Sequence, residues 1–378
     1  MEVEQFRWTG GHGWEPAAPG GLADRAQLVL AFGSTAVLRD GVQLAALRQA
    51  YPRAHLLGCS TAGEIFGTQV GDNTLVATAV RFEATRVAGA LVTVRDADDS
   101  AAAGATLARA LDPRGLVHVL VLSDGLHVNG SALVCGMTGE LPEAVTVTGG
   151  LSGDGARFKE TYVAWDGPAT PRAIAAIGLY SDRLRVGHGS LGGWDPFGPE
   201  RLVTRSRGNV LYEVDGRPAL ALYKTYLGEH ANELPASGLL FPLSLRTESG
   251  GGLVRTILAV DEAEESMTFA GDVPEGAYVR LMKANFDRLI DGAVGAARAS
   301  RERLRAAPAD LAILISCVGR KLVLHQRIEE EVEGVREVLG PRTVLTGFYS
   351  YGEISPFTPT GRCELHNQTM TITTLSEH

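Results

Sequence analysis

The chain has 378 residues, of which 45% are hydrophobic and 21% charged, as in a globular protein of two or three domains. Its net charge of −9 argues against a nucleic-acid partner, because such a partner requires a basic surface. The chain shows neither a signal peptide nor an apolar run of membrane-spanning length, and its four dispersed cysteines are typical of reduced thiols, so we expect a cytoplasmic protein without a membrane partner.

After a Gly- and Pro-rich lead-in over residues 1–26, the chain is predicted to form a strand–helix–strand unit and then two strands with no helix between them. These elements cover, in order, residues 27–32, 42–50, 54–57, 74–82 and 85–94. The helix is indicated by Leu44 and Leu47 on one face and by Pro52, which closes it. The last two strands are expected to pair with each other.

The strand–helix–strand pattern occurs twice more. An alanine-rich helix (101–111) precedes the second unit, whose strands are predicted over 116–122 and 145–148. The strands of the third unit are predicted over 311–315 and 343–346. Its helix carries an apolar stripe at spacings of three and four, formed by Leu324, Ile328, Val332, Val335 and Leu339. Its acidic side chains are expected to form a solvated face, and they are Glu329, Glu330, Glu331 and Glu333.

The segment between the second and third units has a different pattern. Strands are predicted over 162–165, 173–180, 184–189 and 254–260, and helices over 219–227 and 283–305. Three strand–helix–strand units with additional antiparallel strands predict an α/β protein of two pseudo-related halves. We place the halves at 27–200 and 201–378, because Pro, Gly and charged residues cluster between 196 and 207.

Two octets, Gly58–Ile65 and Gly347–Ile354, share one pattern: a glycine, four residues rich in hydroxyl or thiol groups, and then Gly-Glu-Ile. Glycine permits close approach to the backbone, the hydroxyls donate and accept hydrogen bonds, and an ionised glutamate accepts them. A loop at the carboxyl end of a strand is a common ligand site in open α/β sheets. The octets therefore indicate a binding site, and the alternative is a tight turn whose glutamate accepts backbone N–H groups.

Several familiar chemistries are not supported by the motifs. The G-x-G-x-x-G match at residues 187–192 leads into Trp194 and Pro196 rather than a helix, so it is not a dinucleotide site. Histidine and cysteine spacings predict no metal site. Cys317 has Arg320 three residues later, which is compatible with either a reactive thiol or a small buried side chain.

The sequence resembles the FIST-domain family, from about Gln27 to Thr373. The similarity to the N-terminal FIST module lies at residues 58–65 and 149–154, and that to the C-terminal module at 216–220, 223, 226–228, 280–282, 316–320 and 347–354. The resemblance implies an intracellular sensory protein for a small ligand, with amino acids or their derivatives as proposed ligands. Some members bind heme and respond to nitric oxide through a partner histidine kinase. The sequence shows no kinase, cyclase or methyl-accepting region, so signalling to a partner in trans is expected.

The leading hypothesis is a non-enzymatic sensor that binds a small polar metabolite between its two halves. The expected ligand-binding residues are Cys59, Ser60, Thr61, Gly63, Glu64, Ser123, Asp124, Gly153, Asp154, Cys317, Arg320, Tyr349, Ser350, Tyr351, Gly352 and Glu353. One alternative is an enzyme that uses Cys59 or Cys317 with the paired carboxylates in the same pocket. No cofactor is expected under the leading hypothesis. The remaining alternative is a heme sensor with His188 as the axial ligand.

Overall fold

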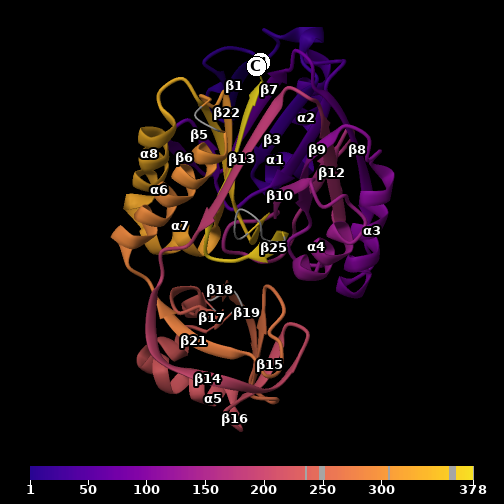
Figure 1. The fold of residues 1–378 in the computed structure, drawn as a ribbon. Helices are drawn as coiled ribbons and strands as arrows, with labels where there is room; N and C mark the ends of the chain where they lie inside the picture. Colours follow the sequence, from indigo (N-terminus) through magenta and orange to yellow (C-terminus); the bar gives the residue numbers. More distant parts are fainter. Residues whose placement is uncertain (235, 247–251, 305–306, 357–362, 378) are drawn as a thin grey trace.

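The computed structural model describes residues 1–234, 236–246, 252–304, 307–356 and 363–377. It has two parts: a larger body of three six-stranded sheets, and a smaller lobe formed by the chain between β13 and α6 (Figure 1). None of the helices in the described ranges is long and apolar enough to span a membrane.

Each sheet of the body is mixed. The first contains, in spatial order, β11 (Val163–Trp165), β4 (His55–Ser60), β3 (Leu28–Gly33), β7 (Thr74–Arg81), β1 (Glu2–Thr9) and β2 (Gly13–Glu15). The second contains β25 (Cys363–His366), β24 (Gly352–Pro356), β10 (Thr146–Leu151), β9 (Leu116–Ser123), β12 (Ala173–Tyr180) and β8 (Arg86–Thr93). The third contains β13 (Leu184–Leu191), β26 (Met370–Glu377), β22 (Leu311–Cys317), β23 (Val344–Ser350), β5 (Glu64–Phe66) and β6 (Gln69–Gly71).

The three sheets are built on one plan. At the centre of each sheet, two strands pair in parallel, and a third strand, later in the sequence, pairs antiparallel with the first of the two. These triplets are β3, β4 and β7; β9, β10 and β12; and β22, β23 and β26. The predicted α/β class with repeated strand–helix–strand units is therefore confirmed.

The sheets also exchange strands in a closed cycle. After β4 in the first sheet, the chain crosses to β5, which pairs with β23 in the third. After β23 it crosses to β24, which pairs with β10 in the second, and after β10 it reaches β11, which pairs with β4 in the first. Each of the three crossings thus joins two sheets, and the two octets are two of these crossings.

The helices cover the outer faces of the sheets. In the first unit these are α1 (Thr35–Asp40) and α2 (Val42–Ala50); in the second, α3 (Ser100–Ala110) and α4 (Gly130–Thr138); in the third, α6 (Phe286–Arg303), α7 (Val318–Leu324) and α8 (Ile328–Leu339). The central strands of the sheets are almost entirely buried, because both of their faces are covered. All eight residues of β12, Ala173–Tyr180, are buried, for example. This core holds the crossings in place.

The lobe is built on a bent antiparallel sheet with its own apolar core. Its strands are β14 (Asp195–Arg207), β15 (Val210–Val214), β16 (Arg217–Pro218), β17 (Leu243–Arg246), β18 (Gly252–Arg255), β19 (Ile257–Asp261), β20 (Ser266–Phe269) and β21 (Tyr278–Lys283), and its helix is α5 (Ala219–Leu227). The segment 196–207, where we expected the boundary between halves, lies within β14, which enters the lobe (Figure 1). After β21 the chain returns to the body through α6, so the third unit of the body follows the lobe in sequence.

The structure differs from the sequence-based expectation in three local features. Residues 2–9 of the expected lead-in form β1, which pairs along its whole length with β7. The segments 74–82 and 85–94 do not pair with each other, because β7 joins the first sheet and β8 the second. The expected strand over 254–260 is divided between β18 and β19, which lie at opposite ends of the lobe's strand order.

Candidate functional site

The three crossings meet in the middle of the body, and we call the turns 60–64, 151–155 and 349–353 the hub. Their backbones are linked in a cycle: Ala62 N–H donates to Tyr349 O at 2.8 Å, and Tyr351 N–H donates to Leu151 O at 3.1 Å. The third bond runs from Gly153 N–H to the Ser60 carbonyl at 2.9 Å. The structure therefore brings together the two octets and the Gly153–Asp154 turn, as the sequence indicated.

The octet glutamates are bonded within the protein. The Glu64 carboxylate accepts from Thr61 Oγ1 at 2.5 Å, and from the hydroxyl and amide of Thr74 at 2.7 and 3.1 Å. The Glu353 carboxylate accepts from Ser350 Oγ at 2.6 Å. It also accepts from the hydroxyl and amide of Thr369, at 3.0 and 3.2 Å. Both side chains are buried, so a ligand contacting them would have to displace these bonds.

Burial strongly affects the ionisation of both glutamates. Desolvation raises the pKa of Glu64 to about 7, although hydrogen bonds from Thr61 and Thr74 act in the opposite direction. Desolvation likewise raises the pKa of Glu353 to about 8, against hydrogen bonds from Ser350 and Thr369. The two carboxyls therefore change charge near neutral pH.

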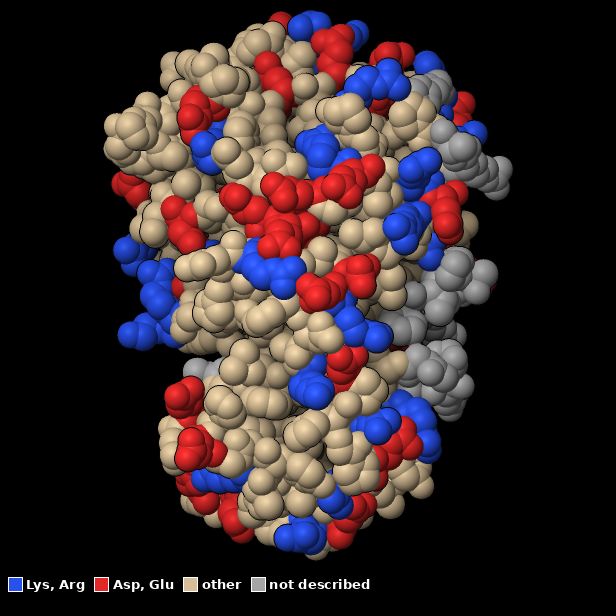
Figure 2. All heavy atoms as spheres, turned by 90° about the vertical axis from the view of Figure 1, so that its left-hand side faces the viewer, with Lys and Arg blue, Asp and Glu red and all other residues tan. Residues whose placement is uncertain are grey.

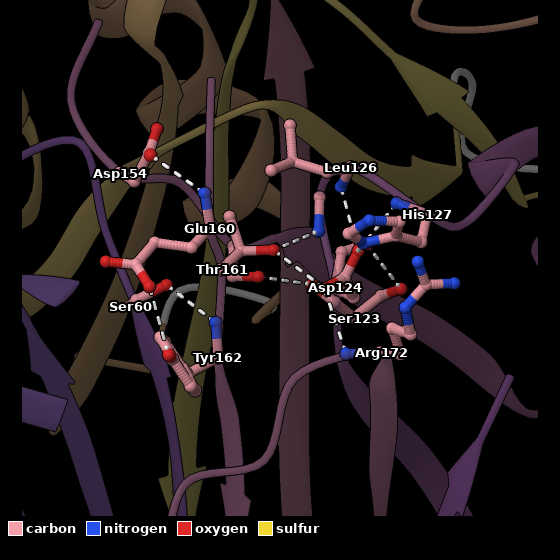
Figure 3. Close-up of polar contacts among 12 residues, drawn as sticks. Ser60, Ser123, Asp124, Leu126, His127, Asp154, Glu160, Thr161, Tyr162 and Arg172 are labelled. Carbon is pink, nitrogen blue, oxygen red and sulfur yellow. Dashed lines mark hydrogen bonds and ion pairs between the residues drawn. The ribbon is translucent and has the colours of Figure 1, made fainter. Parts of the chain in front are cut away.

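In the second strand–helix–strand unit, a buried carboxylate follows the first strand, β9, and belongs to Asp124 (Figure 3). Its Oδ1 accepts from the backbone N–H groups of Leu126 and His127 at 2.9 and 2.6 Å. Its Oδ2 accepts from Thr161 Oγ1 at 2.8 Å and from the Arg172 N–H at 3.1 Å. The neighbouring Ser123 hydroxyl donates to the carbonyl oxygen of Asp124 at 3.0 Å. Asp124 thus anchors the ends of β9 and β12 to the segment that leads into β11.

Asp154 organises the loop of the crossing from β10 to β11. Its carboxylate accepts from the backbone N–H groups of Phe158, Lys159 and Glu160 at 2.8, 2.9 and 3.1 Å. The Tyr351 hydroxyl donates to the same carboxylate, and the Tyr351 ring stacks on Phe158 with a centroid distance of 4.5 Å. Ser60 also holds this segment, because its Oγ accepts from the Tyr162 N–H at 2.9 Å. Figure 3 shows Asp154 and Ser60 beside the segment that carries Thr161 and leads into β11.

Arg320 and Glu331 form a fully buried ion pair at 2.7 Å. The remaining Arg320 bonds go to the carbonyl oxygens of Leu289 and Gly192. The Tyr349 hydroxyl donates to the second oxygen of Glu331 at 2.6 Å. The expectation that Glu331 belongs to a solvated face is therefore wrong, although Figure 2 shows acidic side chains gathered on the side that α6 and α8 form. Glu331 faces inward because Arg320 and Tyr349 supply its donors.

Cys59, in β4, and Cys317, the last residue of β22, are both buried thiols. Desolvation raises the pKa of Cys59, and Glu64 adds to the effect. Desolvation also raises the pKa of Cys317, reinforced by Glu353 and only partly opposed by Arg320. A nucleophilic cysteine needs a lowered pKa, so neither thiol has the electrostatic environment that an enzyme would require.

His188 lies on β13, between two glycines that pack against α6. A methyl group at Gly187 would lie 2.1 Å from the Ser300 carbonyl oxygen, and one at Gly189 would lie 2.2 Å from that of Ala296. The glycines therefore allow the helix to approach the strand. Burial and, to a smaller extent, the positive charge of Arg303 together lower the pKa of His188 to about 4. The structure thus accounts for this motif through packing.

A cleft of about 700 Å³ lies between the body and the lobe, and we call it the interlobe cleft. Its lining from the body comprises Ser131, Val134, Cys135, Thr138, Cys363, Glu364 and Leu365. Its lining from the lobe comprises Leu245, Arg246, Leu253, Arg255, Asp272, Pro274, Gly276, Ala277 and Tyr278. Sequence reasoning missed all of these residues, because they come from separate short segments with no shared motif.

The chain matches two family models: the FIST N domain over residues 27–217 and the FIST C domain over residues 219–356. It is 26% identical over 270 residues to the uncharacterized protein Rv0628c of Mycobacterium tuberculosis, covering 67% of this chain and 66% of that protein. It is 22% identical over 210 residues to the uncharacterized protein MJ1623 of Methanocaldococcus jannaschii, covering 50% of this chain and 39% of that protein. The chain thus spans less than two thirds of the length of both relatives. A crystal structure of cyanuric acid hydrolase from A. caulinodans aligns over 100% of this chain and 99% of that one, with a TM-score of 0.36 and 10% identity.

Proposed function

Because this chain belongs to the FIST family, we propose that it is a cytoplasmic sensory protein that binds a small polar ligand, such as an amino acid, and signals to a partner in trans. FIST domains are associated with sensory roles in signal transduction. The proposed ligand site is the interlobe cleft, between the body and the lobe. The hub is a less suitable contact surface, because its polar side chains already have partners within the protein.

The observation that supports this site is the size and lining of the interlobe cleft. Its volume of about 700 Å³ falls within the range of small-molecule sites. Its charged lining residues are of both signs, with Arg246 and Arg255 opposed by Asp272 and Glu364. A zwitterion places one charge against each sign, so an amino acid complements this lining better than a purely apolar molecule does.

One pair of strands, β24 and β25, connects the cleft to the hub. Leu365 lies on β25 and lines the cleft. The strand β25 pairs with β24, and in this pairing His366 of β25 lies opposite Glu353 of β24. From the lobe, Arg255 donates to the Leu365 carbonyl oxygen at 2.9 Å. A ligand in the cleft would therefore contact the lobe and the strand beside the hub together. This arrangement supports a signal carried by the position of the lobe relative to the body.

Isothermal titration calorimetry against the twenty amino acids tests the proposal. Cys135→Trp places a large side chain on the exposed, cleft-lining face of α4, and is expected to abolish binding. Thr106→Trp, at an exposed position on α3 away from the cleft lining, is the matched control and should bind normally. Absence of binding by every amino acid to the folded protein, or equal binding by both variants, would contradict the proposed site.

A further inference from the structure

Arg255 is a buried cation whose charge is not paired at close range. Its side chain is 4% exposed at the end of β18. Its Nε donates to the Asp272 carbonyl oxygen at 3.0 Å, and its Nη1 donates to Leu365 O. Within the described parts of the chain, no carboxylate lies within ion-pair distance of Arg255, whereas the equally buried Arg320 has Glu331. Burying an unpaired charge is costly, so a counter-ion at Arg255 would stabilise the folded protein.

Ser131, which lines the same cleft, supplies a hydroxyl without a hydrogen-bond partner among the described residues. Its Oγ is buried, and it has no hydrogen-bond partner among the residues that the structure describes. Ser131 is the second residue of α4, whose N-cap Asn129 accepts from the Ala132 N–H through its side chain. The first N–H groups of a helix lack intrahelical acceptors and carry a partial positive charge. A hydroxyl without a partner therefore lies where an anion would be favoured.

Gly271 shows that these two groups lie close together, beside one backbone position. A methyl group at Gly271 would lie 2.9 Å from Arg255 Nε and 3.0 Å from Ser131 Oγ. Arg255 belongs to the lobe and Ser131 to the body, so the pair bridges the two parts. Both residues line the interlobe cleft, so a molecule inside it would lie beside them.

We propose that Arg255, Ser131 and the first turn of α4 form an anion subsite that binds the carboxylate of the ligand. This inference rests on the proposed function and narrows the ligand class to small carboxylic acids. A guanidinium presents parallel N–H donors that match the two oxygens of a carboxylate. Phosphate is the less suitable anion, because Asp272 and Glu364 line the same cleft and would repel a dianion. The same two carboxylates are available to an ammonium group on the ligand.

The test compares each of the twenty amino acids with its carboxamide, and includes inorganic phosphate, by calorimetry. We expect the acids to bind and the amides to bind at least about tenfold more weakly, because a hydrogen bond to a charged group is stronger than one to a neutral group. Arg255→Gln should abolish this preference, but it also alters the contact between lobe and body. Ser131→Ala is the cleaner variant, because the Ser131 hydroxyl has no partner in the described structure whose loss would destabilise the fold. It should weaken binding of the acids by about fivefold or more and leave that of the amides unchanged.

Thr256→Val is the matched control, since Thr256 Oγ1 is also buried without a partner among the described residues but does not line the cleft. It should bind the acids as the wild type does. In one outcome, Cys135→Trp abolishes binding, but the amides bind as well as the acids and Ser131→Ala has no effect. That outcome would overturn the carboxylate subsite and leave the proposed function standing. Tighter binding of phosphate than of any acid, lost in Ser131→Ala, would overturn the carboxylate assignment. Absence of binding by all probes to folded protein would overturn both.

Discussion

Glu64 and Glu353 occupy equivalent crossings between sheets, and their carboxylates are held in the same way. Each accepts from a hydroxyl three residues earlier in its own turn, Thr61 at 2.5 Å and Ser350 at 2.6 Å. Each also accepts from both the amide and the hydroxyl of a threonine at the start of the antiparallel strand of its unit: Thr74 is the first residue of β7, and Thr369 directly precedes β26. The repeated octet therefore encodes a repeated buried network, in which the glutamate satisfies donors of the turn and of the neighbouring strand.

The first prediction concerns pH and follows from burial of these carboxyls. Desolvation raises the pKa of Glu353 from the 4.5 of the exposed group to about 8. The folded protein therefore holds a proton that the unfolded chain releases, so the stabilising contribution of the protonated carboxyl is full below about pH 4.5 and is lost as pH rises towards about 8. Between these limits, the free energy of unfolding should fall with rising pH through this group, by roughly 1 kcal/mol per pH unit.

Urea denaturation of Glu353→Gln across this pH window is the measurement. The variant lacks the titrating group, so its free energy of unfolding should fall less steeply with pH than that of the wild type. Glu64→Gln should act in the same direction over a narrower window, because burial raises the pKa of Glu64 only to about 7. Glu333→Gln, at an exposed position of α8, should leave the slope unchanged. Parallel slopes for wild type and Glu353→Gln would show that Glu353 is ionised throughout.

The sequence predicted the elements of this fold better than the partners of those elements. The octets and the apolar runs are local patterns, so the units and the hub turns could be found from them. Pairing depends on contacts distant in sequence, which is why β7 and β8 were expected to pair although they belong to different sheets. Glu331 was misplaced for the same reason: its partner Arg320 lies on another helix, and a run of acidic residues is usually solvated. The interlobe cleft has no local pattern at all.

The second prediction concerns a glycine that occurs at the same position of all three units. Gly58, Gly149 and Gly347 each face a carbonyl of the neighbouring parallel strand. A methyl group at Gly347 would lie 1.8 Å from the Leu314 carbonyl oxygen, which is backbone and cannot rotate away. Gly347→Ala should therefore lower the free energy of unfolding by about 3 kcal/mol or more, as measured by urea denaturation. Gly11→Ala is the control, because a methyl group at that position meets no atom within 4 Å. Equal stability of the two variants would mean that the strands separate without cost.

The last prediction tests whether Arg320 is a structural residue or a ligand-binding one. Its guanidinium is fully buried, and it is paired with Glu331 at 2.7 Å. Removing one member of a buried pair leaves the other charge uncompensated, so Arg320→Met should lower the free energy of unfolding by about 3–5 kcal/mol. Glu331→Gln should also destabilise the protein, and it weakens the hydrogen bond that Glu331 accepts from Tyr349.

The double variant Arg320→Met/Glu331→Gln should be more stable than the sum of the single effects predicts, because it removes both charges together. Arg114→Met, which breaks the exposed pair with Asp112, should leave stability almost unchanged. Amino-acid binding at the interlobe cleft should persist in Arg320→Met at temperatures where the variant is folded, since Arg320 does not line the cleft. Loss of binding in Arg320→Met without loss of stability would instead place the guanidinium at the ligand, as the sequence alone had suggested.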